Sequence, residues 1–235
     1  MADLPSFRWY FLQMDQVDTK RLYCTEGACA RRPTQNPKPL YQKGTTMLQE
    51  MEVNIKGVSQ LLIHNGQTAN PLNKFARQLK AVSGKRNKTD EDVEAMAKIE
   101  FMAGWYLGEK GEYTLPAHNI EAVMLEGAKK NKNGRLVQGG VFVESDPVLV
   151  FPGSDKTPEQ LWERGENALM VSVRVQRNRV MRTRPIVPAG WTSKIVVKYD
   201  PTVIEEPAIR QAFSVAGRER GIGDWRPKYG RFVVD

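Results

Sequence analysis

Arginine dominates the part of the sequence whose residue types could do chemistry. Five of the eleven residues in 174–184 are arginines, namely Arg174, Arg177, Arg179, Arg182 and Arg184. A guanidinium group binds phosphate oxygens through paired hydrogen bonds, a geometry that an ammonium group lacks. No Asp or Glu lies between Glu166 and Asp200. Crowded guanidinium groups without nearby carboxylates favour an anionic partner such as a sugar-phosphate strand.

A second basic segment, residues 218–231, combines cations with glycines and two aromatic rings. Its glycines would let the backbone approach a phosphate, and its rings could stack on bases or simply pack in a tight turn. Residues 83–88 form a third basic segment, which we expect to make secondary contacts. The expected nucleic-acid contacts are Arg177, Arg179, Arg182, Arg184, Arg220, Trp225, Arg226, Lys228, Tyr229, Arg231, Lys85, Arg86 and Lys88.

The net charge supports the same interpretation. The 235-residue chain has a formal charge of +8, and residues 171–235 carry 13 Lys and Arg against six Asp and Glu. Nearly all of the excess charge therefore lies in the last quarter of the chain. Such an asymmetry favours a polyanion partner, and the alternative is a basic face that only contacts water.

Residues that could hold a metal ion are sparse. Cys24 and Cys29 are five residues apart, and neither His64 nor His118 has the paired spacing of a zinc site. No motif of a nucleophilic hydrolase is present. The sequence therefore predicts no catalytic residue, no metal and no cofactor.

The alternative enzyme would be a metal-dependent ribonuclease, which needs carboxylates near the RNA. Its only candidates are Asp90, Asp92 and Asp224. The first two follow Thr89 at the start of an expected helix, so a capping box explains them without a metal.

Hydrophobic spacing predicts the elements that position these residues. Residues 1–46 form a Pro-rich, irregular leader with aromatic residues suited to docking, and residues 47–235 form one globular domain. We expect helices over 70–82, with Leu72 on the apolar face, and over 93–107, 118–130, 157–164 and 205–218. We expect strands near 51–55, within 136–151, on both sides of Arg177-Asn178, and at 191–200 and 231–235. The face that each arginine takes stays open, because a two-residue turn at Arg177-Asn178 and a three-residue turn there would place the same arginine on opposite faces of the ribbon.

This order predicts an α+β fold, a ferredoxin-like or RNA-recognition-motif core with helical and β-hairpin insertions. Four segments, MEVNIKGVSQLLIHNGQ, TLPAHNIEAVMLEGAKK, PAGWTSKIVVKYD and GIGDWRPKYGRFVV, give the chain a resemblance to a known family. It resembles the RAMP-type backbone subunits of CRISPR effector complexes and is similar in size to compact virus-borne members. The family's RNA-cleaving Asp, where present, lies in an early loop, which here offers Asn65, Asn70 and Asn73.

The resemblance implies a non-catalytic, RNA-binding subunit that assembles in multiple copies along single-stranded guide RNA in a CRISPR-type ribonucleoprotein. Its partners would be copies of itself and other effector subunits, with the leader clasping an adjacent subunit. The sequence does not distinguish RNA from single-stranded DNA as the ligand, or a role in antiviral defence from one in counter-defence. An alternative is a virus-encoded decoy or single-strand-binding protein that acts through protein contacts. Without a signal sequence or an apolar run of roughly 18 residues, we expect a cytoplasmic protein and no membrane partner.

Overall fold

The computed structural model of the chain describes residues 48–175 and 177–235. The predicted leader, residues 1–46, lies outside this part, as do Cys24 and Cys29. No helix of the described residues is long and apolar enough to cross a bilayer.

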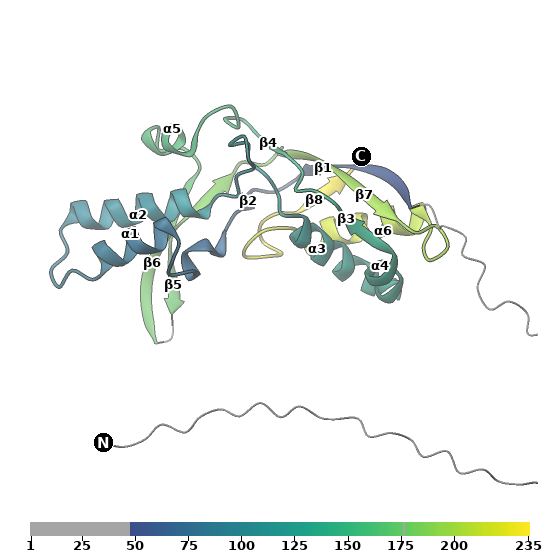
Figure 1. The fold of residues 1–235 in the computed structure, drawn as a ribbon, viewed down its shortest axis with the longest axis horizontal. Coiled ribbons are helices and arrows are strands. Elements are labelled where there is room, and N and C mark those ends of the chain that lie inside the picture. The colour runs from purple at the N-terminus through teal and green to yellow at the C-terminus, as the bar shows by residue number, and fades with distance from the viewer. Residues whose placement is uncertain (1–47, 176) are drawn as a thin grey trace, which may run out of the picture. The chain divides into compact units, whose positions relative to one another are not determined.

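The core of the domain is an antiparallel sheet in the strand order β3-β7-β1-β8, with β4 also paired to β7 (Figure 1). Side chains alternate along β1, where Met51, Val53 and Ile55 are buried and Glu52 is exposed, as the period of two predicted. The bounds are β1 Gln49–Gly57, β3 Val141–Val143, β4 Leu149–Val150, β7 Thr192–Tyr199 and β8 Phe232–Val234.

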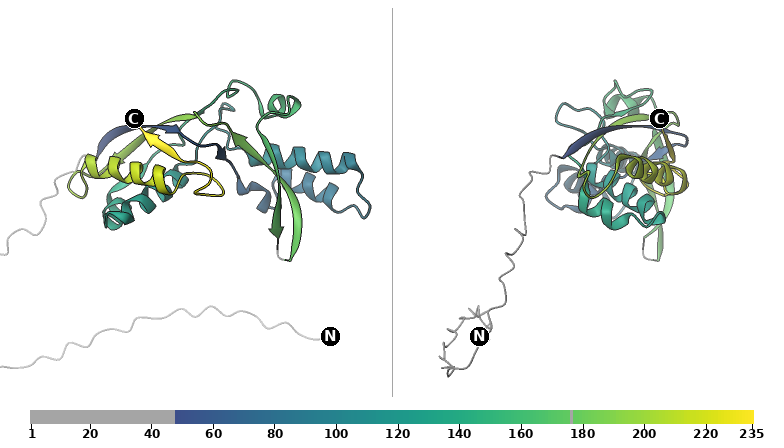
Figure 2. Two further views of the ribbon diagram at one scale, coloured as in Figure 1. Left: turned by 180° about the vertical axis from the view of Figure 1, so that it is seen from behind. Right: turned by 90° about the vertical axis from the view of Figure 1, so that its right-hand side faces the viewer.

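Helices α3 (Ala117–Lys130) and α6 (Glu206–Glu219) pack side by side against one face of this sheet (Figures 1 and 2). Each buries one apolar stripe, as its helical period predicted. The buried residues are Ile120, Val123, Met124 and Ala128 on α3, and Ile209, Phe213 and Ala216 on α6.

Together these elements form the strand–helix–strand–strand–helix–strand order of a ferredoxin-like core. The fold is therefore α+β, as predicted. One local prediction was wrong, because residues at the start of the expected strand segment 136–151 belong to helix α4 (Gly134–Gly140), and strand begins at Val141.

The first insertion follows β1. It contains β2 (Leu61–Leu62), the 3-10 helix η1 (Gly66–Ala69), α1 (Lys74–Ser83) and α2 (Asp90–Gly104). Helix α2 begins with the predicted capping box, in which Thr89 and Asp92 exchange hydrogen bonds. Leu72, expected on the apolar face of the preceding helix, is instead 73% exposed and lies before its first residue.

The second insertion contains α5 (Pro158–Glu163) and the predicted hairpin, β5 (Ala168–Val175) and β6 (Asn178–Val187). Strand β2 pairs with the core end of β6, so a second sheet has the order β2-β6-β5. Helix α2 packs beside the hairpin, and the Thr183 N–H on β6 donates to Glu100 on α2 at 2.8 Å. The hairpin and the α1–α2 pair thus form one unit next to the core (Figure 1).

Candidate nucleic-acid interface

The register of the hairpin decides which face each arginine takes. Val175 pairs with Asn178, so two residues link the strands, and Asn178, expected in the turn, belongs to β6 instead. Arg182 and Arg184 share one face of β6, because side chains two apart point the same way. Arg179 points to the opposite face, directly across from Arg174. The five arginines therefore do not form one patch.

The arginines of the first face have carboxylate partners, contrary to the expectation that the segment lacks them. Arg182 forms an ion pair with Glu100 on α2, and Arg184 forms one with Asp224 in the 220–231 loop. Both partners are distant in sequence, which is why local charge spacing did not reveal them. These two ion pairs thus offset part of the charge repulsion among the arginines.

Arg184 lies deepest among these cations, with only 15% of its side chain exposed. Its guanidinium carbon is 6.0 Å from the centre of the Trp225 ring, within cation–π range. Burial lowers the pKa of Arg184, although arginine stays charged at neutral pH. The contact joins the hairpin to the glycine-containing loop.

The glycines of that loop serve packing within the protein. At Gly230 (φ 75°) an added Cβ would overlap the Ile222 carbonyl, and at Gly223 (φ 87°) it would press on the Leu62 carbonyl. The Asp224 N–H also donates to the Leu62 carbonyl at 2.8 Å. The space beside these glycines is filled by backbone, so they do not offer it to a phosphate.

The cations of this loop lie at its surface. Arg220 and Arg226 both approach Glu126 on α3, at 3.8 and 3.7 Å. Lys228 lies 5.3 Å from the Tyr229 ring, and Arg231 donates to the Pro227 carbonyl. Trp225 is 38% exposed, so much of its ring is available for stacking.

Three neighbouring cavities bring several of these residues together. The hairpin cavity is lined in part by Arg182, Arg184, Glu100 and His64, and the loop cavity by Arg220, Trp225, Arg226 and Glu126. A central cavity lies between them, sharing His64 with the first and Gly223 and Asp224 with the second. We call this run of three cavities the arginine groove.

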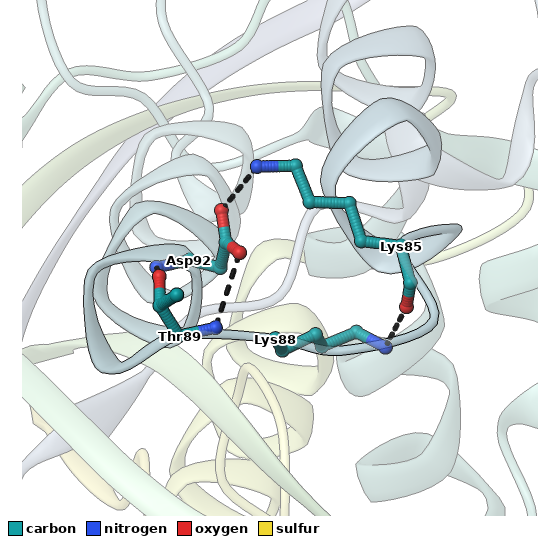
Figure 3. Close-up of polar contacts among 4 residues, drawn as sticks. All are labelled: Lys85, Lys88, Thr89 and Asp92. Atoms are coloured by element: carbon teal, nitrogen blue, oxygen red, sulfur yellow. Dashed lines mark hydrogen bonds and ion pairs between the residues drawn. The ribbon is translucent and has the colours of Figure 1, made fainter.

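The predicted contacts at 85–88 lie apart from the arginine groove, in the loop that joins α1 to α2 (Figure 1). Lys85 forms a 2.5 Å ion pair with Asp92, and Lys88 donates to the Lys85 carbonyl (Figure 3). The Lys85 bond and the capping bond from Thr89 lower the pKa of Asp92. Arg86 is exposed. Asp92, which the sequence predicted only as a capping residue, therefore also forms an ion pair with Lys85.

Arg177 and Arg179 lie at the turn end of the hairpin and are exposed to solvent. Within the described part of the chain, no carboxylate lies within ion-pair distance of either. For these two arginines of the hairpin, the expectation of no nearby carboxylate agrees with the described structure.

The three carboxylates considered for a ribonuclease do not converge. Asp90 and Asp92 lie at the start of α2, whereas Asp224 lies in the 220–231 loop beside Arg184. No group of three or more His, Cys, Asp or Glu side chains arranged to hold a metal ion occurs among the described residues.

Sequence reasoning missed Glu100 as part of the site, although the sequence contains a signal. Glu100 follows Met96 by four residues and precedes Ala103 by three, so it falls within the apolar stripe of α2. A carboxylate inside an apolar stripe predicts a buried cationic partner, because an unpaired buried charge is unfavourable. Its side chain is 11% exposed.

Neither a protein-family model nor a curated protein matches the sequence. Among solved structures, the chain is similar to the crystal structure of Cmr6 from Pyrococcus furiosus. The TM-score is 0.30 and the sequence identity 13%, over 80% of this chain and 98% of that chain. At this TM-score the likeness carries no functional argument, and the resemblance to the RAMP family stays a prediction from the sequence motifs.

Proposed function

We propose that this chain is a non-catalytic subunit that binds single-stranded RNA along the arginine groove. The observation that carries the proposal is the gathering of Arg182, Arg184, Arg220 and Arg226 around neighbouring cavities, with Trp225 among them. Two distant stretches of sequence contribute these cations. Phosphates bound at both ends of the groove would place a strand across the glycine-containing loop.

The ion pairs of the groove leave donors for phosphate on Arg182, Arg220 and Arg226, whereas Nε and Nη1 of Arg184 are buried. A guanidinium has five N–H groups, and a single carboxylate contact uses only some of them. Arg220 and Arg226 are held loosely, since their nitrogens lie more than 3.5 Å from the Glu126 oxygen. The partly exposed Trp225 ring supplies a stacking surface that accepts any base.

The finer form of the proposal rests on the sequence resemblance. In that form, copies of the chain line up along guide RNA in a CRISPR-type ribonucleoprotein. The hairpin end, with Arg177 and Arg179, would contact the strand outside the groove. The loop that contains Arg86 would add a secondary contact.

The salt dependence of RNA binding tests the proposal. Fluorescence anisotropy with a labelled 20-nucleotide RNA should give an affinity that falls by about 0.7 log units per log unit of salt for each phosphate contact. In the double variant Arg220→Ser/Arg226→Ser, the slope should decrease by about 1.4. The matched control, Lys129→Ser/Lys132→Ser, removes two exposed cations, one at the end of α3 and one just after it, and should leave the slope unchanged.

An affinity that does not change with salt would overturn the proposal. RNA cleavage in the presence of Mg²⁺ would instead favour the ribonuclease. Capture of effector subunits by nuclease-treated protein that does not bind RNA would favour the decoy.

A further inference from the structure

The central cavity of the arginine groove differs in chemistry from its two neighbours. Among the described residues that line it, none is Lys or Arg. Its volume is about 150 Å³. Its walls are apolar and firmly buried, since Leu61, Ile63, Leu115 and Ile222 are each at most 3% exposed.

Polar groups occur at the edge of this cavity, contributed by His64, Tyr106, Asn119 and Asp224. The Tyr106 hydroxyl already donates to the His64 carbonyl at 3.0 Å. Loss of water around the ring and the charge of Arg184 lower the pKa of His64, which favours the neutral imidazole. The Asn119 amide can both donate and accept, and a carboxylate oxygen of Asp224 can accept an N–H.

This combination favours a flat, uncharged ligand with a polar edge. A phosphate would meet apolar walls, with no Lys or Arg among the described residues of the lining and with the Asp224 carboxylate already paired to Arg184. An apolar cavity of about 150 Å³ is large enough to bind benzene. A single aromatic ring that carries N–H and C=O groups therefore matches both the size and the edge of the cavity.

Resting on the proposed function, we propose that the central cavity receives one single-ring base, a pyrimidine, from the bound strand. The phosphates on either side of that nucleotide would then lie at the hairpin cavity and the loop cavity. A purine has a second fused ring, and fitting it would force the buried walls apart. The cavity thus gives the chain a preference for pyrimidines.

Anisotropy titrations with oligouridylate, oligoadenylate and an abasic strand of equal length test this inference. Wild-type protein should bind oligouridylate about tenfold more tightly than the abasic strand, the typical effect of one well-held base. The variant Asn119→Phe places a ring in the cavity. It should bind oligouridylate several-fold more weakly than the wild type does, and its affinity for the abasic strand should fall much less.

The matched control is His118→Phe, which adds the same ring at the neighbouring, exposed position of α3. It should bind all three strands as the wild type does. The ratio of oligouridylate to oligoadenylate affinity should also fall in Asn119→Phe. The bases of free oligoadenylate also stack on one another, which changes its affinity. Because this effect is the same for both proteins, it cancels when the ratio is compared between the wild type and the variant.

The outcomes separate this inference from the proposed function. If wild-type protein binds none of the strands at low salt, the proposed function fails. If it binds oligouridylate and the abasic strand equally, and Asn119→Phe changes neither affinity, only the pyrimidine cavity is overturned. Should Asn119→Phe fail to fold in a thermal unfolding experiment, Asn119→Ala replaces it. That variant enlarges the cavity and removes the amide, so it should lower both the oligouridylate affinity and its ratio to oligoadenylate.

Discussion

At the scale of single residues, Arg182 combines an internal ion pair with donors left over for a ligand, whereas most of the paired Arg184 guanidinium is buried. Glu100 and Asp224 hold the two guanidinium groups in place. The pairing lowers the cost of bringing two like charges close together on one strand face. It also reduces the net positive charge that an approaching strand experiences, so these carboxylates should oppose RNA binding while they stabilise the fold.

The variant Glu100→Gln should therefore change stability and affinity in opposite directions. Its free energy of unfolding should fall by about 1 kcal/mol, because a partly exposed ion pair contributes little more than this. RNA affinity should rise several-fold, since one negative charge leaves the groove. Urea denaturation and anisotropy measure the two effects.

Glu94→Gln is the matched control, because Glu94 is an exposed residue of the same helix. It removes one negative charge away from the groove and should leave the affinity nearly unchanged. Weaker RNA binding by a folded Glu100→Gln protein would contradict the prediction and would show that Glu100 positions Arg182 for the strand.

At the scale of elements, each insertion is stabilised by local devices that the sequence encodes. Helix α2 starts with a capping box, and the α1–α2 loop is tied to it by Lys85 (Figure 3). The hairpin has a two-residue turn and is supported along one edge by α2. The ends of both insertions remain in solvent, where basic side chains are accessible to a strand.

The capping box gives a prediction about pH. The pKa of Asp92 is lowered in the folded protein by Lys85 first and by Thr89 second. Its contribution to stability is therefore complete above the ordinary carboxyl pKa and is lost as the pH falls through the lowered value. NMR titration of the Asp92 carboxyl should show its midpoint rising in the variant Lys85→Gln. An unchanged midpoint would show that Lys85 does not interact with Asp92 in solution.

The same helix start predicts a stability effect that does not depend on titration. Thr89→Ala should lower the free energy of unfolding by about 1 kcal/mol, because an N–H of the first turn loses its side-chain acceptor. Thr89→Ser keeps a hydroxyl at the cap and should restore most of this loss. Equal stability of Thr89→Ala and the wild type in urea denaturation would argue against the cap.

The hairpin end predicts an effect on binding without an effect on folding. Arg177→Ser/Arg179→Ser should reduce the salt slope of RNA binding by about 1.4, as expected for two phosphate contacts on a single strand. Thermal unfolding should be unchanged, since both side chains lie in solvent. An unaltered slope would exclude the hairpin end from the RNA contact.

At the scale of the whole molecule, the ferredoxin-like core acts as the scaffold on which two insertions meet. The α2 helix of the first insertion packs against β6 of the second, and the 220–231 loop joins both to the core through Arg184 and Asp224. The arginine groove exists only because these three parts converge.

Assembly in copies gives a prediction at this scale. The number of chains bound per RNA should increase in steps as the RNA is lengthened, which native mass spectrometry measures. The RNA should stay full-length on a denaturing gel after incubation with Mg²⁺. A single chain per RNA at every length would contradict assembly in copies.

Most of the fold could be predicted from the sequence, because local rules decide local structure. Alternation predicted β1, the helical period predicted α3 and α6, and Thr89 with Asp92 predicted the start of α2. These signals act over two to four residues, so they need no knowledge of distant segments. The prediction was wrong at Leu72, where an apolar residue next to the helix had no core to enter.

By itself, the sequence determined the order of elements, the excess of positive charge in the last quarter and the hairpin that carries five arginines. Only the tertiary structure decided which arginine meets which carboxylate. Glu100 lies 82 residues from Arg182 in the chain, and that pairing depends on how α2 packs beside β6. Periodicity acts over a few residues, whereas an ion pair requires two side chains to meet in space. The face of each arginine and the central cavity could therefore be established only from the folded chain.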